Sequence, residues 1–305
     1  MWAVVLWGAF AACAGAASGE PQSGDFITEV VETRAREDRT EYLLRFPSPR
    51  KSPWAANDTV WAHLSVPRAR GAGRAPAVLV LPVMAAPNVW IESRFVDRFV
   101  RDGFVTMWLE MPTQFHRRPH PSIPSGQVFL ARTPKTLARN FRQSVADARR
   151  ALGVLAARPE VDGGRMALFG ISLGAIVASA TWSVDERPRA GVFLLGGADF
   201  PSLVLNGSLS GPFARKMGLE PDDLARAWRG LDPLEHKSEN KGKKALLVNA
   251  RSDTVIPRAN ALFLKEAFPD SSQIWLPLGH YSAIVHVLWL PRWVSWRLAR
   301  ALNER

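Results

Sequence analysis

The residues of this chain that could perform chemistry centre on one serine. Ser172 stands in a Gly-x-Ser-x-Gly pattern at residues 170–174, between an apolar run at 166–169 and a run of small, mostly apolar residues at 175–180. This order predicts a buried strand, a sharp turn and a helix, with the serine hydroxyl projecting from the turn. The turn strains the serine backbone and crowds the residues two positions away, and both of these are glycine. The pattern also occurs by chance, so a nucleophile needs further support.

A serine hydroxyl is a weak nucleophile unless a base accepts its proton and an acid orients that base. His280 lies in a loop after the expected strand 274–276, where it could act as the base. Asp253 and Asp199 each follow an expected buried strand, so each could stand at the same sheet edge as Ser172. Asp253 is preferred, because a turn and a helix start follow it and its strand comes closer in order to His280. His116 also follows a strand end, where it either lines a pocket or lies in a solvated loop.

Strands and helices alternate through most of the chain. Apolar runs predict buried strands, and 3.6-residue periodicity predicts helices between them. The expected strands are 41–46, 59–66, 77–81, 104–109, 166–169, 190–195, 245–248 and 274–276, and the expected helices include 91–102, 137–157, a short stretch at 222–229, and 283–302. This alternation predicts an α/β fold with a mainly parallel, twisted sheet covered by helices on both faces.

The sequence resembles the α/β-hydrolase superfamily, in its dienelactone-hydrolase-like and acetyl-esterase-like branches. The resemblance spans about residues 75–302 and rests on four features. These are Asp162 and Arg165 before the serine pattern, the pattern itself, Asp253 followed by Val255 and Pro257, and the pair Gly279-His280. The order Ser172, Asp253, His280 is the order of the triad in this fold.

The resemblance implies a serine hydrolase, in the first place a carboxylic ester hydrolase with an acyl-enzyme intermediate. Ser172 would attack the acyl carbon, His280 would transfer the proton and Asp253 would orient the histidine. Many esterases carry His-Gly-Gly after the strand that ends here at 81, whereas this chain continues Pro-Val-Met. The oxyanion hole is therefore expected to use the N–H of Leu173 with that of Val83 or Met84. No metal or organic cofactor is implied.

Three alternatives stay open at this point. A peptidase or an acyltransferase would use the same triad, and a binding protein of this fold could have lost turnover. The insertion at about 200–244 lies between two expected strands and is expected to form a small lid above the strand C-terminal ends. Because it is smaller than the cap of many lipases, the expected substrate is a small-molecule ester with a short acyl group.

The composition indicates which kinds of partner this chain could bind. The 305 residues include 39 Lys and Arg against 28 Asp and Glu, which gives a formal charge of +11, and 47% of residues are hydrophobic. The excess is scattered, so it predicts weak attraction to anionic surfaces and no nucleic-acid groove. Trp289, Trp293 and Trp296 could form a membrane-facing stripe, although a helix face packed on the sheet is the favoured interpretation. Weak peripheral membrane association stays open.

The first seventeen residues contain no charged side chain and end in small residues, as a secretory signal peptide does. We therefore expect a signal peptide at 1–17, a flexible linker at 18–25 and the hydrolase domain at 26–305, in a secreted or periplasmic protein. Cys13 is the only cysteine, so cleavage after residue 16 or 17 removes the thiol and excludes disulfides and cysteine nucleophiles. Lipidation of Cys13 is the less favoured alternative.

Overall fold

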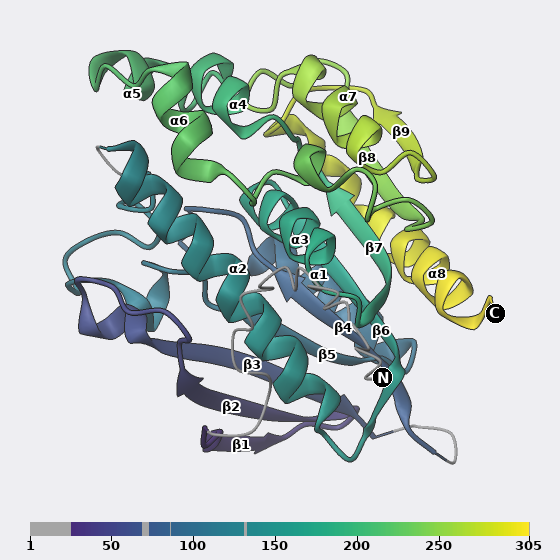
Figure 1. Ribbon diagram of the computed structural model, residues 1–305. Coiled ribbons are helices and arrows are strands. Elements are labelled where there is room, and N and C mark those ends of the chain that lie inside the picture. The colour runs from purple at the N-terminus through teal and green to yellow at the C-terminus, as the bar shows by residue number, and fades with distance from the viewer. Residues whose placement is uncertain (1–25, 69–72, 86, 131–132, 305) are drawn as a thin grey trace, which may run out of the picture.

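The computed structural model describes residues 26–68, 73–85, 87–130 and 133–304 (Figure 1). The predicted signal peptide, the linker and Cys13 lie outside the described residues. Within the described part of the chain, no helix has both the length and the apolar character needed to cross a membrane.

One sheet of nine strands runs through the described residues (Figure 1). Its order is β1-β2-β3-β5-β4-β6-β7-β8-β9. The three strands at one edge pair antiparallel, and so do β3 and β5, whereas all pairs from β5 through β9 are parallel. The strands are β1 (Glu29–Ala35), β2 (Arg39–Pro47), β3 (Thr59–Pro67), β4 (Ala75–Leu81), β5 (Val105–Leu109), β6 (Val161–Ile171), β7 (Pro188–Leu194), β8 (Ala245–Ala250) and β9 (Ser272–Leu276).

Helices cover both faces of this sheet, as predicted. The long helices α2 (Pro134–Ala156) and α3 (Leu173–Ser183) lie in front of the sheet in Figure 1. They share one core cluster with α7 (Arg258–Ala267), whereas α1 (Trp90–Arg101) and α8 (Leu290–Asn303) share the other. The sequence-based prediction of a mainly parallel sheet between two helical layers is confirmed.

Strand β4 shows why the apolar runs lie in the middle of the sheet. Leu79 and Leu81 point into the first core cluster, while Val78 and Val80 point into the second. All four side chains are buried. A strand that is apolar at every position can be covered on both faces, which is the pattern of parallel sheets.

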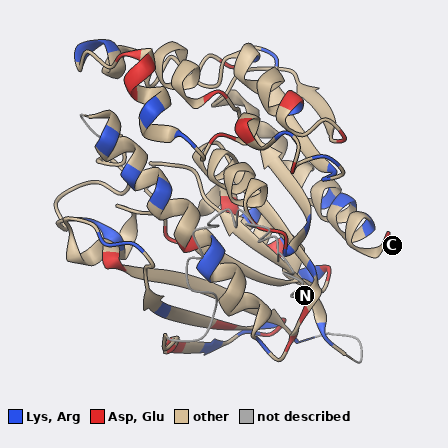
Figure 2. Ribbon diagram, viewed as in Figure 1, with Lys and Arg blue, Asp and Glu red and all other residues tan. Residues whose placement is uncertain are grey.

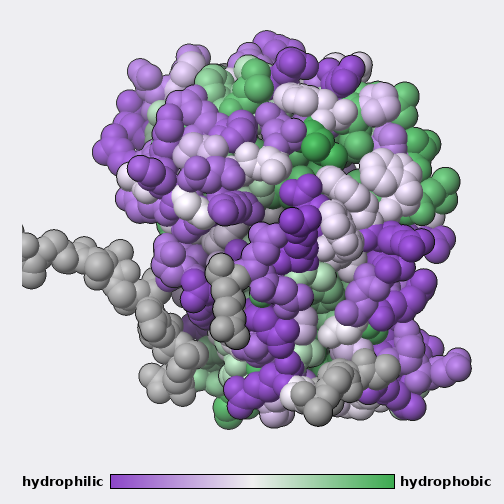
Figure 3. All heavy atoms as spheres, turned by 90° about the vertical axis from the view of Figure 1, so that its right-hand side faces the viewer, coloured by the Kyte–Doolittle hydropathy of each residue, from purple (hydrophilic) through white to green (hydrophobic). Residues whose placement is uncertain are grey.

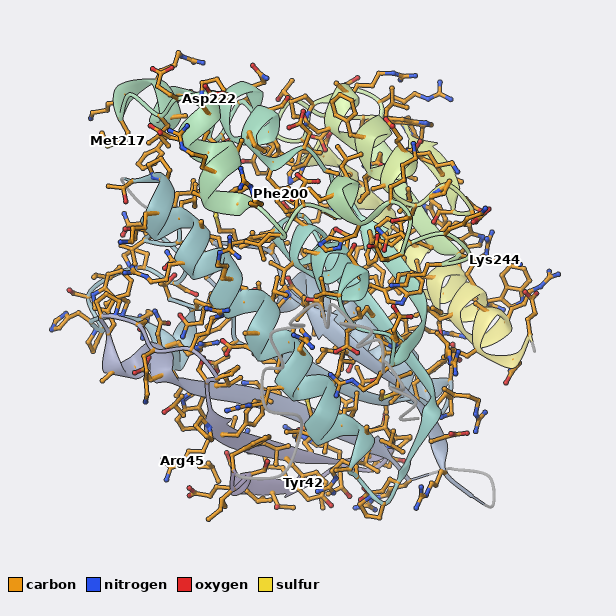
Figure 4. All side chains as sticks on the ribbon, in the orientation of Figure 1. Tyr42, Arg45, Phe200, Met217, Asp222 and Lys244 are labelled. Carbon is orange, nitrogen blue, oxygen red and sulfur yellow. The ribbon has the colours of Figure 1, made fainter. Side chains whose placement is uncertain are left out.

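The segment between β7 and β8 forms several short helices near the strand C-terminal ends. These are α4 (Phe200–Asn206), α5 (Gly211–Lys216), α6 (Pro221–Trp228) and the 3-10 helix η3 (Pro233–His236). Phe200, Met217 and Asp222 mark this segment in the upper part of Figure 4. Only the last of the three α-helices was expected from the sequence.

The predicted final helix is wrong in its first part. Residues 282–288 form a 3-10 helix, η4 (Ser282–Leu288), and α8 begins only at Leu290, with Pro291 in its first turn. Proline lacks the N–H that an uninterrupted helix would need there. The buried face of α8 consists of Leu290, Val294, Leu298 and Leu302. The expected packing of the tryptophans on the sheet therefore fails for Trp289 and Trp296, which are 46% and 53% exposed.

Candidate active site

The backbone at Ser172 has the strained geometry that the serine pattern predicts. Ser172 lies between the end of β6 and the start of α3, with φ 54° and ψ −117°. A positive φ is rare for a residue with a side chain, and strain of this kind concentrates at functional sites. The Ser172 N–H donates to the carbonyl of Leu194 in β7, at 2.8 Å, and so ties the turn to the sheet.

The two glycines of the pattern are required because no side chain would fit at their positions. A Cβ built on Gly170 would overlap the carbonyl of Gly174, and one built on Gly174 would overlap the carbonyl of Leu81 at the end of β4. The helix can therefore approach the strand ends closely enough to present Ser172 at the edge of the sheet.

The three predicted triad residues lie in one chain of hydrogen bonds. Ser172 Oγ is 3.0 Å from Nε2 of His280, and Nδ1 of His280 is 2.8 Å from Oδ2 of Asp253. The His280 and Asp253 side chains are only 8% and 3% exposed. With the proton on Nδ1 held by the carboxylate, Nε2 is free to accept the serine proton.

Asp253 is itself fixed by the turn that follows β8. Its Oδ1 accepts the backbone N–H groups of Val255 at 2.9 Å and Ile256 at 2.8 Å, which leaves Oδ2 for the histidine. Asp199, the alternative acid, instead caps α4 by accepting the N–H of Ser202. The preference for Asp253 thus agrees with the contacts in the structure.

The loop after β4 supplies the second candidate oxyanion donor. Leu173 is the first residue of α3, and the first N–H groups of a helix have no partner within it. Of the two residues expected to assist it, Val83 donates its N–H to Oε1 of Glu92, at 2.9 Å, and is therefore engaged. This contact removes Val83 from the expected donors and leaves Met84.

Two side chains that the sequence analysis missed brace this loop. Gln114 donates its Nε2 to the carbonyls of both Val83 and Met84, each at 2.6 Å. Glu92, in the first turn of α1, is 1% exposed, and burial raises the pKa of its carboxyl. A charged residue on an apolar helix face beside Phe95 and Phe99 was a signal for Glu92, whereas nothing marked Gln114.

A cavity of about 590 Å³ opens at Ser172 and His280. Its walls come from both core clusters, so it extends to either side of the sheet's carboxyl edge. Among the described residues, no Asp, Glu, Lys or Arg lines it. Representative apolar residues of its walls are Phe95, Phe141, Phe200, Leu203, Trp228 and Leu276.

The other histidine considered for the site lies elsewhere. His116 stacks on Trp61 and bonds to the buried carboxylate of Glu110, and it is not part of the cavity wall. In the part of the chain that the structure describes, no three His, Cys, Asp or Glu side chains are grouped closely enough to hold a metal ion.

Comparison with known proteins identifies the fold. No protein-family model matches the sequence, and no curated protein matches it significantly. Solved structures do match. An acetyl xylan esterase from Paenibacillus sp. R4 superposes with a TM-score of 0.63 at 17% identity, over 90% of this chain and 89% of that one. A glucuronoyl esterase from Solibacter usitatus superposes with a TM-score of 0.61 at 13% identity, over 94% and 88%.

A third match is to part of a larger protein. The acylaminoacyl peptidase of Pyrococcus horikoshii superposes with a TM-score of 0.59 at 14% identity, over 88% of this chain but 48% of that one. At these identities the likeness concerns the fold. The chain has the α/β-hydrolase fold, as its sequence motifs predicted.

Proposed function

We propose that this protein is a serine esterase that hydrolyses carboxylic esters through an acyl-enzyme. The observation that carries the proposal is the hydrogen-bonded chain Ser172–His280–Asp253 beside a cavity large enough for a small molecule. The strained backbone at Ser172 adds support, since strain of this kind concentrates at functional sites. The names of the esterase structures with this fold agree with the proposal.

The chemistry would follow from the contacts. Ser172 Oγ attacks the ester carbonyl carbon while Nε2 of His280 accepts the hydroxyl proton. The N–H groups of Leu173 and Met84 would receive the oxyanion. His280 then passes its proton to the departing alkoxide, which leaves as the alcohol. Water attacks the acyl-enzyme by the same proton transfers and releases the acid. Asp253 holds His280 in the required tautomer and stabilises its charged form.

The cavity wall favours an apolar acyl group longer than acetyl. This changes the expectation of a short acyl group, which rested on the length of the insertion alone. The walls around Phe141, Leu203 and Trp228 offer no charged partner for a sugar or an amino acid side chain among the described residues. Burial of each added methylene in such walls is worth about 0.8 kcal/mol, or up to about fourfold in kcat/KM.

A series of p-nitrophenyl esters from acetate to decanoate tests both parts of this proposal. We expect kcat/KM to rise along the series until the cavity is filled. Leu209 lines the cavity and is 44% exposed, so Leu209→Arg should lower the rate on the long esters more than on the acetate. Leu262 in α7 is 46% exposed and lies outside the wall, so Leu262→Arg is the matched control.

The outcomes separate the alternatives. A maximum at the acetate would refute the apolar acyl site, and absence of turnover on every ester would refute the esterase. Faster cleavage of the matching anilides than of the esters would indicate a peptidase. Transfer of the acyl group to an added alcohol in preference to water would indicate an acyltransferase.

A further inference from the structure

The segment that follows His280 carries a group of exposed apolar side chains. We call Tyr281, Ile284, Val285, Leu288 and Trp289 the apolar rim. Their exposed fractions are 69%, 43%, 52%, 89% and 46%. Single exposed apolar residues are ordinary, but five within nine consecutive positions form a contiguous patch, which marks an interaction surface. The face drawn in Figure 3 carries its apolar surface mainly in its upper right part, whereas hydrophilic residues dominate the lower part.

The apolar rim adjoins the mouth of the cavity. Tyr281 and Ile284 belong both to the rim and to the cavity wall, and Val287 on the same 3-10 helix also lines the cavity. Helix η4 contacts both α1 and α8. A molecule that touches the rim would therefore lie directly at the entrance to Ser172.

The charges nearest the rim come from two arginines near the starts of α8 and α1. Residues 277–296 contain no Asp or Glu and one arginine, Arg292, in the first turn of α8. Figure 2 shows basic residues along α8. Arg297 and Arg300, farther along α8, lie away from the rim, beside the starts of β7, β8 and β9, where Arg300 pairs with Glu304. On the neighbouring α1, Arg94 lies 5.1 Å from the ring of Trp90, which is 45% exposed.

We infer that the apolar rim inserts into an anionic lipid surface, with Arg292 of α8 and Arg94 of α1 at the level of the headgroups. Tryptophan rings prefer this interface, and each nearby Arg adds attraction to an anionic bilayer. The docked protein would take its ester from the bilayer, because the rim opens into the apolar cavity. The docking itself needs no turnover and can be tested apart from the proposed esterase activity.

Flotation with vesicles tests the inference on the full chain. Vesicles of phosphatidylcholine with about 30% phosphatidylglycerol should carry the protein, and neutral phosphatidylcholine vesicles should carry less. Val285 and Leu288 do not line the cavity, so Val285→Ser with Leu288→Ser should weaken vesicle binding by about tenfold or more. Arg292→Gln should weaken binding to the anionic vesicles by about fivefold, and added salt should do the same.

A matched control comes from the opposite edge of the sheet. Ile27 and Val30 are 85% and 48% exposed, close to the values for Leu288 and Val285. Ile27→Ser with Val30→Ser should leave vesicle binding unchanged. Both double variants should hydrolyse p-nitrophenyl butyrate in solution as the wild type does, which shows that the fold and the triad are intact.

Three results would overturn the inference. The first is wild-type protein that stays unbound at physiological salt. The second is a rim variant that floats as well as the wild type. The third is a wild-type dimer in solution that the rim substitutions convert to a monomer, since the rim would then contact a second copy of the chain.

Discussion

At the scale of single residues, two aspartates follow neighbouring strands and have different tasks. Asp253 faces Nδ1 of His280, whereas Asp199 caps a short helix. Asp253→Asn should lower kcat/KM by about four powers of ten, because an amide cannot hold the histidine in the required tautomer. Asp199→Asn keeps a capping oxygen and should cost less than about tenfold. Kinetics on one p-nitrophenyl ester decide this, and a larger loss for Asp199→Asn would reverse the assignment.

Glu92 should make stability depend on pH. Burial raises the pKa of this carboxyl, so the folded chain holds the proton more tightly than the unfolded chain does. Stability due to Glu92 is therefore lost as the pH rises from about 4.3, the ordinary pKa of a glutamate, toward the raised pKa of Glu92 in the folded chain. Gln at this position keeps an acceptor for the Val83 N–H without a charge.

The measurement is urea unfolding of the wild type and of Glu92→Gln at several pH values. The unfolding free energy of the variant should increase relative to that of the wild type as the pH rises above about 4. At higher pH this difference should become constant. A difference that stays constant with pH, or that changes in the other direction, would show that Glu92 is not held as described.

At the scale of elements, the site depends on the close approach of α3 to the end of β4. Gly174→Ala would place a methyl group against the Leu81 carbonyl, so the turn must shift. We expect a loss of about 2 kcal/mol or more in unfolding free energy, together with loss of activity. A Cβ built on Gly163, in strand β6, would meet only the Cβ of Ala156, at 4.0 Å, so Gly163→Ala is the control. If both variants lose the same free energy of unfolding, the glycine at position 174 is not required for close packing.

Elements with a strong local signal were predictable, and elements set by tertiary contacts were not. The runs at 77–81 in β4 and 166–169 in β6 are apolar at every position, a pattern typical of strands covered on both faces. The insertion helix α4 has no such period. Its start depends on the Asp199 cap and on the N–H of Phe200 donating to Asp232, 32 positions along the chain.

The same contrast holds within the site. The serine pattern, Asp253 and His280 were visible because each follows a strand end in the order that the fold requires. The engagement of Val83 was not visible, because it depends on a buried carboxylate from another element. Cavity shape was also hidden, since residues from many separate elements line it.

At the scale of the whole molecule, the cavity lies where the parallel strands of the sheet end, and helices from both layers close it. The predicted signal peptide concerns this scale too. Because residues 1–17 are uncharged and end in small side chains, the chain should begin at residue 17 or 18 after export. N-terminal sequencing of protein from its native host measures this directly. An intact Met1, or a lipid on Cys13, would contradict simple cleavage.

The account rests most on Ser172 as the nucleophile, and covalent labelling tests that claim directly. A fluorophosphonate should add one group to the wild type, at Ser172, because only a serine activated by His280 reacts readily. Ser208 is exposed and lies within the insertion, so Ser208→Ala should label as the wild type does. Ser172→Ala should take no label, stay folded and lose at least about four powers of ten in ester turnover. Label on another residue, or turnover that survives in Ser172→Ala, would contradict the account.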